Sequence, residues 1–194
     1  MEQVKEHKYY ALYKPWGYLS QFKYELSNRR NKKRLGELGD FEEGTMAVGR
    51  LDEDSEGLLL LTTDGKFSAD IRSKTVEKEY WVQVDGEITP EACEELTKGV
   101  DISINGKKYR TFPCIAEPID FEPTFPPRAK KIRDARHGPT SWVKIIVTEG
   151  KFRQVKKMTA AVGFPTLRLV RVRVGDFELD GLDSGEYREF TVSS

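Results

Sequence analysis

Apolar residues along this chain fall into short runs that turn residues separate, which is the pattern expected of strands. The run Tyr9–Tyr13 ends at a Lys-Pro-Trp-Gly turn, and Leu58–Thr62 is followed by an Asp-Gly turn. Ile102–Ile104 is joined to the next run by Asn-Gly, the sequence of a tight hairpin. We therefore predict strands at these positions and also at 45–48, 80–84, 107–109, 142–147, 167–174 and 187–192.

Helical patterns are fewer. Thr89 can cap a helix that begins at Pro90 and runs to about Gly99. A second helix is predicted over 151–162, ended by a glycine and a nearby proline, and a short one over 67–72. Since strands outnumber helices, the pattern predicts an α+β fold with a mixed, largely antiparallel sheet flanked by a few helices.

The length of 194 residues favours one domain, 1–194, which the pattern divides into two subdomains at about 1–75 and 76–194. A proline-rich, basic stretch over 123–139 is predicted to be a long surface loop, and loops of that length are often functional.

Composition excludes several classes of protein. No apolar run approaches the roughly 20 residues that cross a bilayer, and the first residues form no apolar leader. Two cysteines, Cys93 and Cys114, cannot build a disulfide scaffold, and two distant histidines have no zinc-ligand spacing. We expect a cytoplasmic protein with no bound metal and no association with membranes.

Equal numbers of basic and acidic residues, 32 of each, conceal an asymmetry. Residues 128–173 contain 13 Lys and Arg but only Asp134 and Glu149 as acids. A second basic block spans Arg29–Arg34. Because the field near a surface depends on charges within about 10 Å, such segments attract polyanions even in a neutral protein. They can equally be solvated faces without a function.

The helix predicted at 151–162 has two faces. Phe152, Val155 and Met158 start an apolar stripe, whereas Arg153, Lys156 and Lys157 share another face. Three adjacent cations repel one another unless something anionic lies opposite. RNA phosphate and a buried carboxylate are the two candidates.

The segment 49–57 carries four carboxylates in five positions, at Asp52, Glu53, Asp54 and Glu56. A solvated acidic loop, or acids that cap the next element, would explain it without a function. Alternatively it could bind Mg²⁺ through its alternate acids or present one carboxylate as a nucleophile.

Four motifs in fixed order are similar to those of a known family. They are Tyr13–Gly17, Gly49–Asp52, Lys78–Tyr80 and Glu149–Met158. In this order they resemble the bacterial ribosomal RNA pseudouridine synthases of the family that includes RsuA and the B-, E- and F-type large-subunit enzymes. The similarity extends from Tyr9 to about Thr191.

Segments 139–142 and 163–169 resemble the E-type branch, which modifies 23S rRNA. The resemblance implies the family's catalytic fold with a central RNA-binding cleft, without the N-terminal S4-like domain of several relatives. It implies 23S rRNA as partner, with a target in the peptidyl-transferase region, and no cofactor. We further expect a monomer with no obligate protein partner.

The resemblance also assigns roles to residues. Asp52 is the expected catalytic aspartate, Lys156 the cation that keeps it ionised, and Tyr80 the tyrosine that stacks on the target base. Asp52 could attack C1′, support it electrostatically or remove a sugar proton, and the sequence does not choose among these routes. Phe152 departs from the polar residue often found at its position.

Basic residues are expected to bind the RNA backbone, and Arg50 to fill the space left by the extruded nucleotide. Lys14 is expected to support the cleft or contact RNA. The RNA-binding set is Arg50, Lys14, Arg128, Lys130, Lys131, Arg133, Arg153 and Lys157, with Arg136 and the Arg29–Arg34 block as further clamps.

Other functions stay open at this point. The specificity could be of the B or F type, for another rRNA uridine or a tRNA uridine. A non-catalytic ribosome-assembly factor could use the same RNA-binding surface, and a metal-dependent nuclease could be built on the acidic loop.

Overall fold

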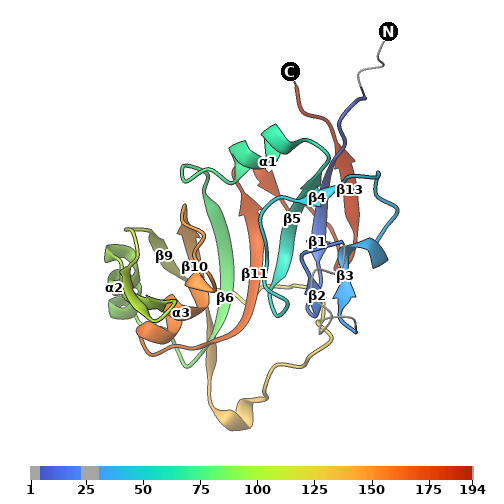
Figure 1. The fold of residues 1–194 in the computed structure, drawn as a ribbon. Coiled ribbons are helices and arrows are strands. Elements are labelled where there is room, and N and C mark those ends of the chain that lie inside the picture. The colour runs from blue at the N-terminus through green and yellow to red at the C-terminus, as the bar shows by residue number, and fades with distance from the viewer. Residues whose placement is uncertain (1–4, 23–30, 194) are drawn as a thin grey trace. The chain divides into compact units, whose positions relative to one another are not determined.

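The computed structural model describes residues 5–22 and 31–193. The chain forms two compact units, one of Met1–Ser73 with Asp176–Ser194 and one of Lys74–Gly175 (Figure 1). The sequence pattern put the second subdomain at 76–194, and the structure differs because the last segment returns to the first unit. There β13 (Tyr187–Phe190) pairs with β1 (Tyr9–Lys14), a long-range pairing that no local pattern encodes.

Three antiparallel strands form the centre of the first unit. β1 lies between β13 and β5 (Glu56–Thr62), and all seven residues of β5 are buried. The remaining elements of this unit are β2 (Tyr18–Leu19), which runs parallel to β3 (Lys33–Arg34), a 3₁₀ turn (Leu35–Glu37), β4 (Met46–Ala47), which pairs with β5, α1 (Gly65–Ile71), and β12 (Phe177–Glu178).

Aromatic rings cover both faces of this small sheet. Tyr9 and Tyr10 are adjacent in β1 and so point to opposite faces. The Tyr9 ring lies 5.1 Å from Phe67 of α1 and 5.8 Å from Phe190 of β13, measured between centroids. On the other face the Tyr10 ring packs edge-on against Phe41 at 5.2 Å. Both sides of β1 are thus closed by apolar side chains.

The second unit contains a four-stranded antiparallel sheet, in the order β11, β6, β10, β9. Helix α2 (Pro90–Lys98) begins at the predicted cap, since the Thr89 side chain accepts a hydrogen bond from the amide of Ala92 at 3.1 Å. The other elements are β6 (Lys78–Asp85), the hairpin of β7 (Asp101–Ile104) and β8 (Lys107–Arg110), β9 (Ile115–Ile119), a 3₁₀ turn (Ala135–His137), β10 (Thr140–Val147), α3 (Gln154–Ala161) and β11 (Thr166–Val174).

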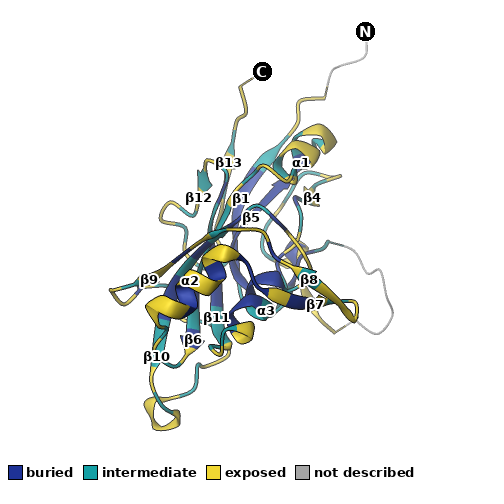
Figure 2. Cartoon of the chain, turned by 90° about the vertical axis from the view of Figure 1, so that its left-hand side faces the viewer, coloured by how far each residue is buried: buried dark blue, intermediate teal, exposed yellow. Residues whose placement is uncertain are grey.

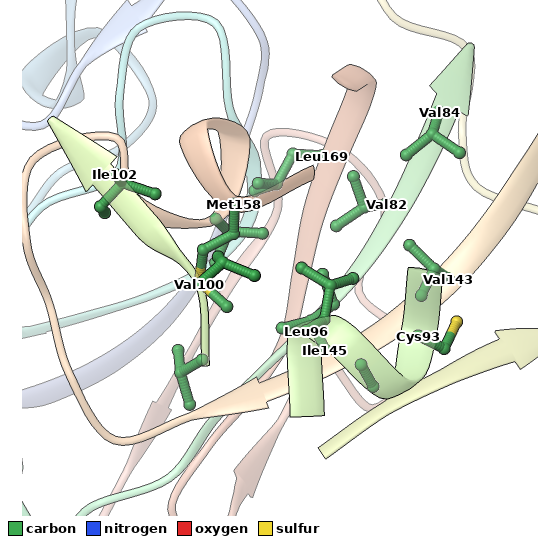
Figure 3. Close-up of a cluster of buried hydrophobic side chains, with 13 residues drawn as sticks. Val82, Val84, Cys93, Leu96, Val100, Ile102, Val143, Ile145, Met158 and Leu169 are labelled. Atoms are coloured by element: carbon green, nitrogen blue, oxygen red, sulfur yellow. The ribbon is translucent and has the colours of Figure 1, made fainter. Parts of the chain in front are cut away.

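One face of this sheet carries the main core of the unit. Val82 and Val143 point from the central strands toward Leu96 of α2 and Met158 of α3, and all four are fully buried (Figure 3). The helices are accordingly two-sided: Figure 2 shows α2 with one buried and one exposed side. Apolar burial of this kind provides most of the stability of a domain this size.

Aromatic residues from the long loop cover the opposite face. Trp81 alternates with the core residue Val82 in β6, so its indole points to the other side. The Phe125 ring lies between Trp81 at 5.7 Å and Trp142 at 5.6 Å. The guanidinium of Arg168 lies 5.7 Å from the centre of the Phe125 ring and donates to the carbonyl of Pro126 at 2.6 Å. The loop over 123–139 is therefore packed onto the sheet.

The α+β class predicted from the sequence is confirmed, with strands close to their predicted positions. Several elements differ, among them the two-residue strands β2, β3 and β12, which the pattern does not predict. Helix α3 begins at Gln154 instead of 151, because Arg153 has a left-handed conformation with φ 50°. Strand β9 has no counterpart in the prediction, since its Glu and Pro residues interrupt the apolar pattern. No helix in the described part of the chain is long and apolar enough to cross a membrane.

Gly99 closes helix α2 and provides a test of this arrangement. Its φ is +93°, and a Cβ there would overlap the carbonyl oxygen of Thr111. Gly99→Ala should therefore lower the free energy of unfolding by about 3 kcal/mol or more. Gly106, in the hairpin turn, has φ +75° and open space around it, so Gly106→Ala should cost only about 1–2 kcal/mol. Urea denaturation of both variants checks the difference, and equal losses would contradict the predicted overlap.

Candidate active site

The loop that carries Asp52 is held by backbone contacts on both sides of this residue. The Ser20 hydroxyl accepts a hydrogen bond from the Leu51 amide at 3.0 Å and donates to the Leu51 carbonyl at 2.6 Å. The Asp52 carbonyl accepts from the amide of Ser55 at 3.0 Å, and the Glu53 carbonyl accepts from Gly17 at 2.7 Å. Asp52 itself is half-buried. Its backbone is thus preorganised, as a reacting carboxylate requires.

Lys14 reinforces the same loop from inside the protein. It is fully buried, and its ammonium donates to the carbonyls of Pro15 at 2.8 Å, Tyr18 at 2.9 Å and Glu53 at 3.4 Å. Three donors thus meet three backbone acceptors. This geometry favours the supporting role over RNA contact, because a fully buried ammonium cannot reach a phosphate.

Tyr80 lies on the helix-covered face of the second unit. It packs, half-buried, against the core cluster that includes Val155 and Met158 of α3. Lys156, also half-buried, lies between these two residues in the sequence of α3. The second unit therefore brings Tyr80 and the helix of Lys156 to one face of its sheet, while Asp52 belongs to the first unit.

Two further cations accompany Tyr80. Lys78 opens one of the four motifs without an assigned role, and sequence reasoning did not single out Arg171. Arg171 is 5% exposed and is the register partner of Tyr80 across β11 and β6, so both side chains point to the same face. Lys78 donates to the carbonyl of Thr148 at 2.6 Å, and its burial, together with the charge of Arg171, lowers its pKa. A buried arginine is rare. The sequence signal that could have identified Arg171 is its position inside the predicted apolar strand 167–174.

A buried carboxylate organises the turn before α3. Glu149 is 8% exposed, and one of its oxygens accepts from the amide of Phe112 at 2.8 Å and from the side chain of Gln154 at 2.9 Å. The other accepts from the hydroxyl of Tyr109. These three hydrogen bonds come from neutral donors, and the Glu149 charge also acts on the ammonium of Lys78. The hydrogen bonds tie the turn to the β7–β8 hairpin.

The three cations predicted on one helical face have different surroundings. Arg153 precedes the helix in its left-handed conformation, and Lys156 lies within it. The ammonium of Lys157 donates to the carbonyl of Ser103 at 2.8 Å and lies 5.3 Å from the centre of the Phe152 ring. Lys157 is therefore at least partly a structural residue.

The basic residues of the long loop also divide into two kinds. Arg133 pairs with Asp85 and donates to the carbonyls of Gly138 at 2.9 Å and Pro139 at 3.1 Å, so it holds the loop end. Arg136 pairs with Asp134. Lys130 and Lys131 are exposed, and Arg128 is half-exposed and donates to the carbonyl of Lys130. The exposed lysines are the members best placed to meet RNA.

Arg50 is exposed on the Asp52 loop, at the edge of an open groove of about 830 Å³ within the first unit. In the second basic block, Arg29 and Arg30 lie outside the described residues. Lys32 pairs with Glu53 at 2.8 Å, and Lys33 lies 5.5 Å from the centre of the Tyr18 ring.

Comparison with known proteins identifies the family of this chain. The family described as RNA pseudouridylate synthase matches residues 8–161, which include Asp52, Tyr80 and Lys156. The chain belongs to this family. It is an enzyme, a pseudouridine synthase, and thus an isomerase of RNA uridine.

Individual relatives agree with the family. The chain is 44% identical over 176 residues to the ribosomal large subunit pseudouridine synthase E of Xanthomonas axonopodis pv. citri, covering 88% of this chain and 87% of the relative. It is 34% identical over 152 residues to the synthase B of Yersinia pestis, covering 77% and 42%. A crystal structure of a pseudouridylate synthase superposes with a TM-score of 0.75 at 28% identity, covering 97% of this chain and 72% of that one. The pseudouridine synthase fold expected from the motifs is thereby confirmed.

The buried contact between Tyr109 and Glu149 predicts a pH dependence for this synthase. The hydrogen bond to Glu149, with burial, raises the pKa of Tyr109 to about 12. The unfolded chain loses this proton near pH 10. The stabilisation is therefore complete below pH 10 and is lost as the pH rises toward 12.

Tyr109→Phe should lower the free energy of unfolding at pH 8 by about 1–3 kcal/mol. This difference from the unsubstituted protein should shrink at pH 11. Urea titrations at the two pH values measure it, and a difference independent of pH would contradict the assignment.

Proposed function

We propose that this synthase converts one uridine of 23S rRNA, in the peptidyl-transferase region, to pseudouridine. The similarity to the synthase E relative carries this proposal, since it extends over most of both chains. Asp52 is proposed as the essential group, and Tyr80 and Lys156 as the further catalytic residues. Asp52 belongs to the first unit and the other two to the second.

The reaction breaks the bond between N1 and C1′, rotates the uracil and joins C5 to C1′. C5 loses a proton and N1 gains one, so product and substrate have the same composition. No oxidant or energy source is needed, and we propose that the enzyme acts without a cofactor and as a monomer without a protein partner.

Each proposed residue has a physical task in this sequence of steps. The Asp52 carboxylate attacks or supports C1′, or removes a sugar proton, and must be ionised to do so. The ammonium of Lys156 favours that ionised form if it lies within about 4–6 Å. Tyr80 stacks on the target base and assists loss of the C5 proton. The hydrogen bonds at Leu51, Asp52 and Glu53 support the proposal by limiting movement of the carboxylate.

RNA binding is assigned to the exposed cations. Lys130 and Lys131, with Arg50, are proposed to contact phosphates, which position RNA without reading its sequence. Arg128, Arg153 and Lys157 are proposed as further RNA contacts. B-type specificity is the second candidate, favoured by 34% identity to the synthase B relative.

Asp52→Asn tests the catalytic proposal. The variant should fold and bind a 23S rRNA fragment like the unsubstituted protein, but form pseudouridine at least about 10⁴-fold more slowly, because an amide cannot replace the carboxylate in the reaction. Glu53→Gln is the matched control, since that carboxylate pairs with Lys32 at the surface, and it should retain activity. Sequencing of chemically labelled pseudouridine identifies the position. Residual activity within tenfold would exclude Asp52 as the essential group.

Salt dependence tests the RNA-binding assignment. The double variant Lys130→Ala, Lys131→Ala should reduce the slope of log affinity against log salt by about 1.4, the value for two contacts to single-stranded RNA. The control is Lys66→Ala, Lys98→Ala, which removes the same charge from two surface ion pairs on α1 and α2. Filter binding at several salt concentrations measures the slope for both double variants. An equal slope for the Lys130, Lys131 variant and the control variant would refute the assignment.

A further inference from the structure

Phe152 is unusually exposed for a large aromatic residue. Its exposed fraction is 69%, above that of every other large hydrophobic residue in the part of the chain that the structure describes. It lies in the turn before α3, between Gly150 and the left-handed Arg153. The turn is closed on both sides, because the Lys151 amide donates to the Gln154 side chain at 3.2 Å and the Gln154 amide donates to the Lys151 carbonyl at 3.1 Å. A defined turn thus presents the ring to solvent.

The Phe152 ring has a cation contact, which comes from Lys157 of α3. The ammonium of Lys157 lies 5.3 Å from the centre of the Phe152 ring and also donates to the carbonyl of Ser103 in β7 at 2.8 Å. Helix α3 and strand β7 lie side by side (Figure 2). The same ammonium thus contacts both the ring and strand β7. Cation–π contacts of this kind contribute to stability even at exposed sites.

Glu149 joins this turn to two further aromatic residues. Its carboxylate accepts from the side chain of Gln154, from the backbone of Phe112 and from the hydroxyl of Tyr109. Phe112 is 52% exposed, and the ammonium of Lys151 lies 5.1 Å from the centre of the Tyr109 ring. Aromatic rings and cations therefore alternate on one surface of the second unit. We call the set Tyr109, Phe112, Lys151, Phe152 and Lys157 the aromatic patch.

The chemistry of the patch favours one kind of partner. Lysine is depleted in the cores of protein interfaces, where aromatic residues are otherwise enriched. Single-stranded nucleic acid, in contrast, binds where aromatic rings stack on bases and cations follow the backbone. The exposed Lys107, at the tip of the adjoining hairpin and on the same face of β8 as Tyr109, extends the positive charge.

We propose that the aromatic patch binds an unpaired stretch of RNA flanking the modified nucleotide, with one base stacked on Phe152. Lys151 and Lys107 contact the adjacent phosphates. This inference rests on the proposed function, to which it adds a second binding surface outside the catalytic residues. The turn that presents Phe152 is closed by hydrogen bonds between Lys151 and Gln154.

Phe152→Ala, Phe152→Trp and Phe121→Ala test this proposal. Phe121 is the matched control, because it is 56% exposed in the same unit but packs on Trp81, on the opposite face of the sheet. Fluorescence anisotropy measures the Kd of a 23S rRNA fragment with unpaired flanks and of the same fragment trimmed to the target stem and loop. Phe152→Ala should raise the Kd of the long fragment about 10-fold or more and leave that of the trimmed fragment unchanged. Phe152→Trp and Phe121→Ala should bind both like the unsubstituted protein.

Several results would overturn the inference. They are an unchanged Kd for Phe152→Ala, an equal loss in Phe121→Ala, or an equal loss on both fragments. Dimerisation that Phe152→Ala abolishes, seen by gel filtration, would assign the patch to a protein contact instead. Pseudouridine formation by the unsubstituted protein in the same RNA separates the two proposals. Its absence refutes the proposed function, whereas its presence with unchanged binding refutes only the patch.

Discussion

Burying a charged side chain is costly unless its hydrogen-bonding capacity is met, and each unit of this protein meets that condition at a loop. In the first unit the ammonium of Lys14 is surrounded by carbonyls and ties the Asp52 loop to the turn after β1. In the second unit the carboxylate of Glu149 is surrounded by donors and ties the turn before α3 to the β7–β8 hairpin. Removing the Lys14 ammonium would leave three backbone carbonyls without this donor, and removing the Glu149 carboxylate would leave one backbone amide and two side-chain donors without this acceptor.

Local patterns in the sequence predicted much of the fold. The capping Thr89 and Pro90, the first residue of α2, specify where the helix starts, and Asn105-Gly106 specifies a hairpin by its preference for positive φ. Such features are short-range. The return of 176–194 to the first unit depends on pairing between strands more than 170 residues apart. The left-handed conformation of Arg153 makes α3 begin three residues later than predicted, and this conformation could not be predicted because the residue is not a glycine.

The candidate site was predictable where chemistry depends on residue type and unpredictable where it depends on burial. The motif around Asp52 and the tyrosine of β6 are recognisable from the sequence alone. Lys14 was expected to support the cleft or contact RNA, and its burial could not be read from a polar turn. Arg133 likewise looks like an RNA ligand in a charge count but holds the end of its loop through backbone carbonyls. The local charge of residues 128–173 therefore overstates the number of cations available to RNA.

The return of β13 to the first unit also bears on biosynthesis. Residues 74–175 are contiguous and contain their own core, so they can fold while the ribosome is still translating the last segment, since domains generally fold as units during synthesis. The first unit needs β13 beside β1 and can be completed only after β13 has left the exit tunnel. The loop that carries Asp52 is therefore part of the portion that matures last.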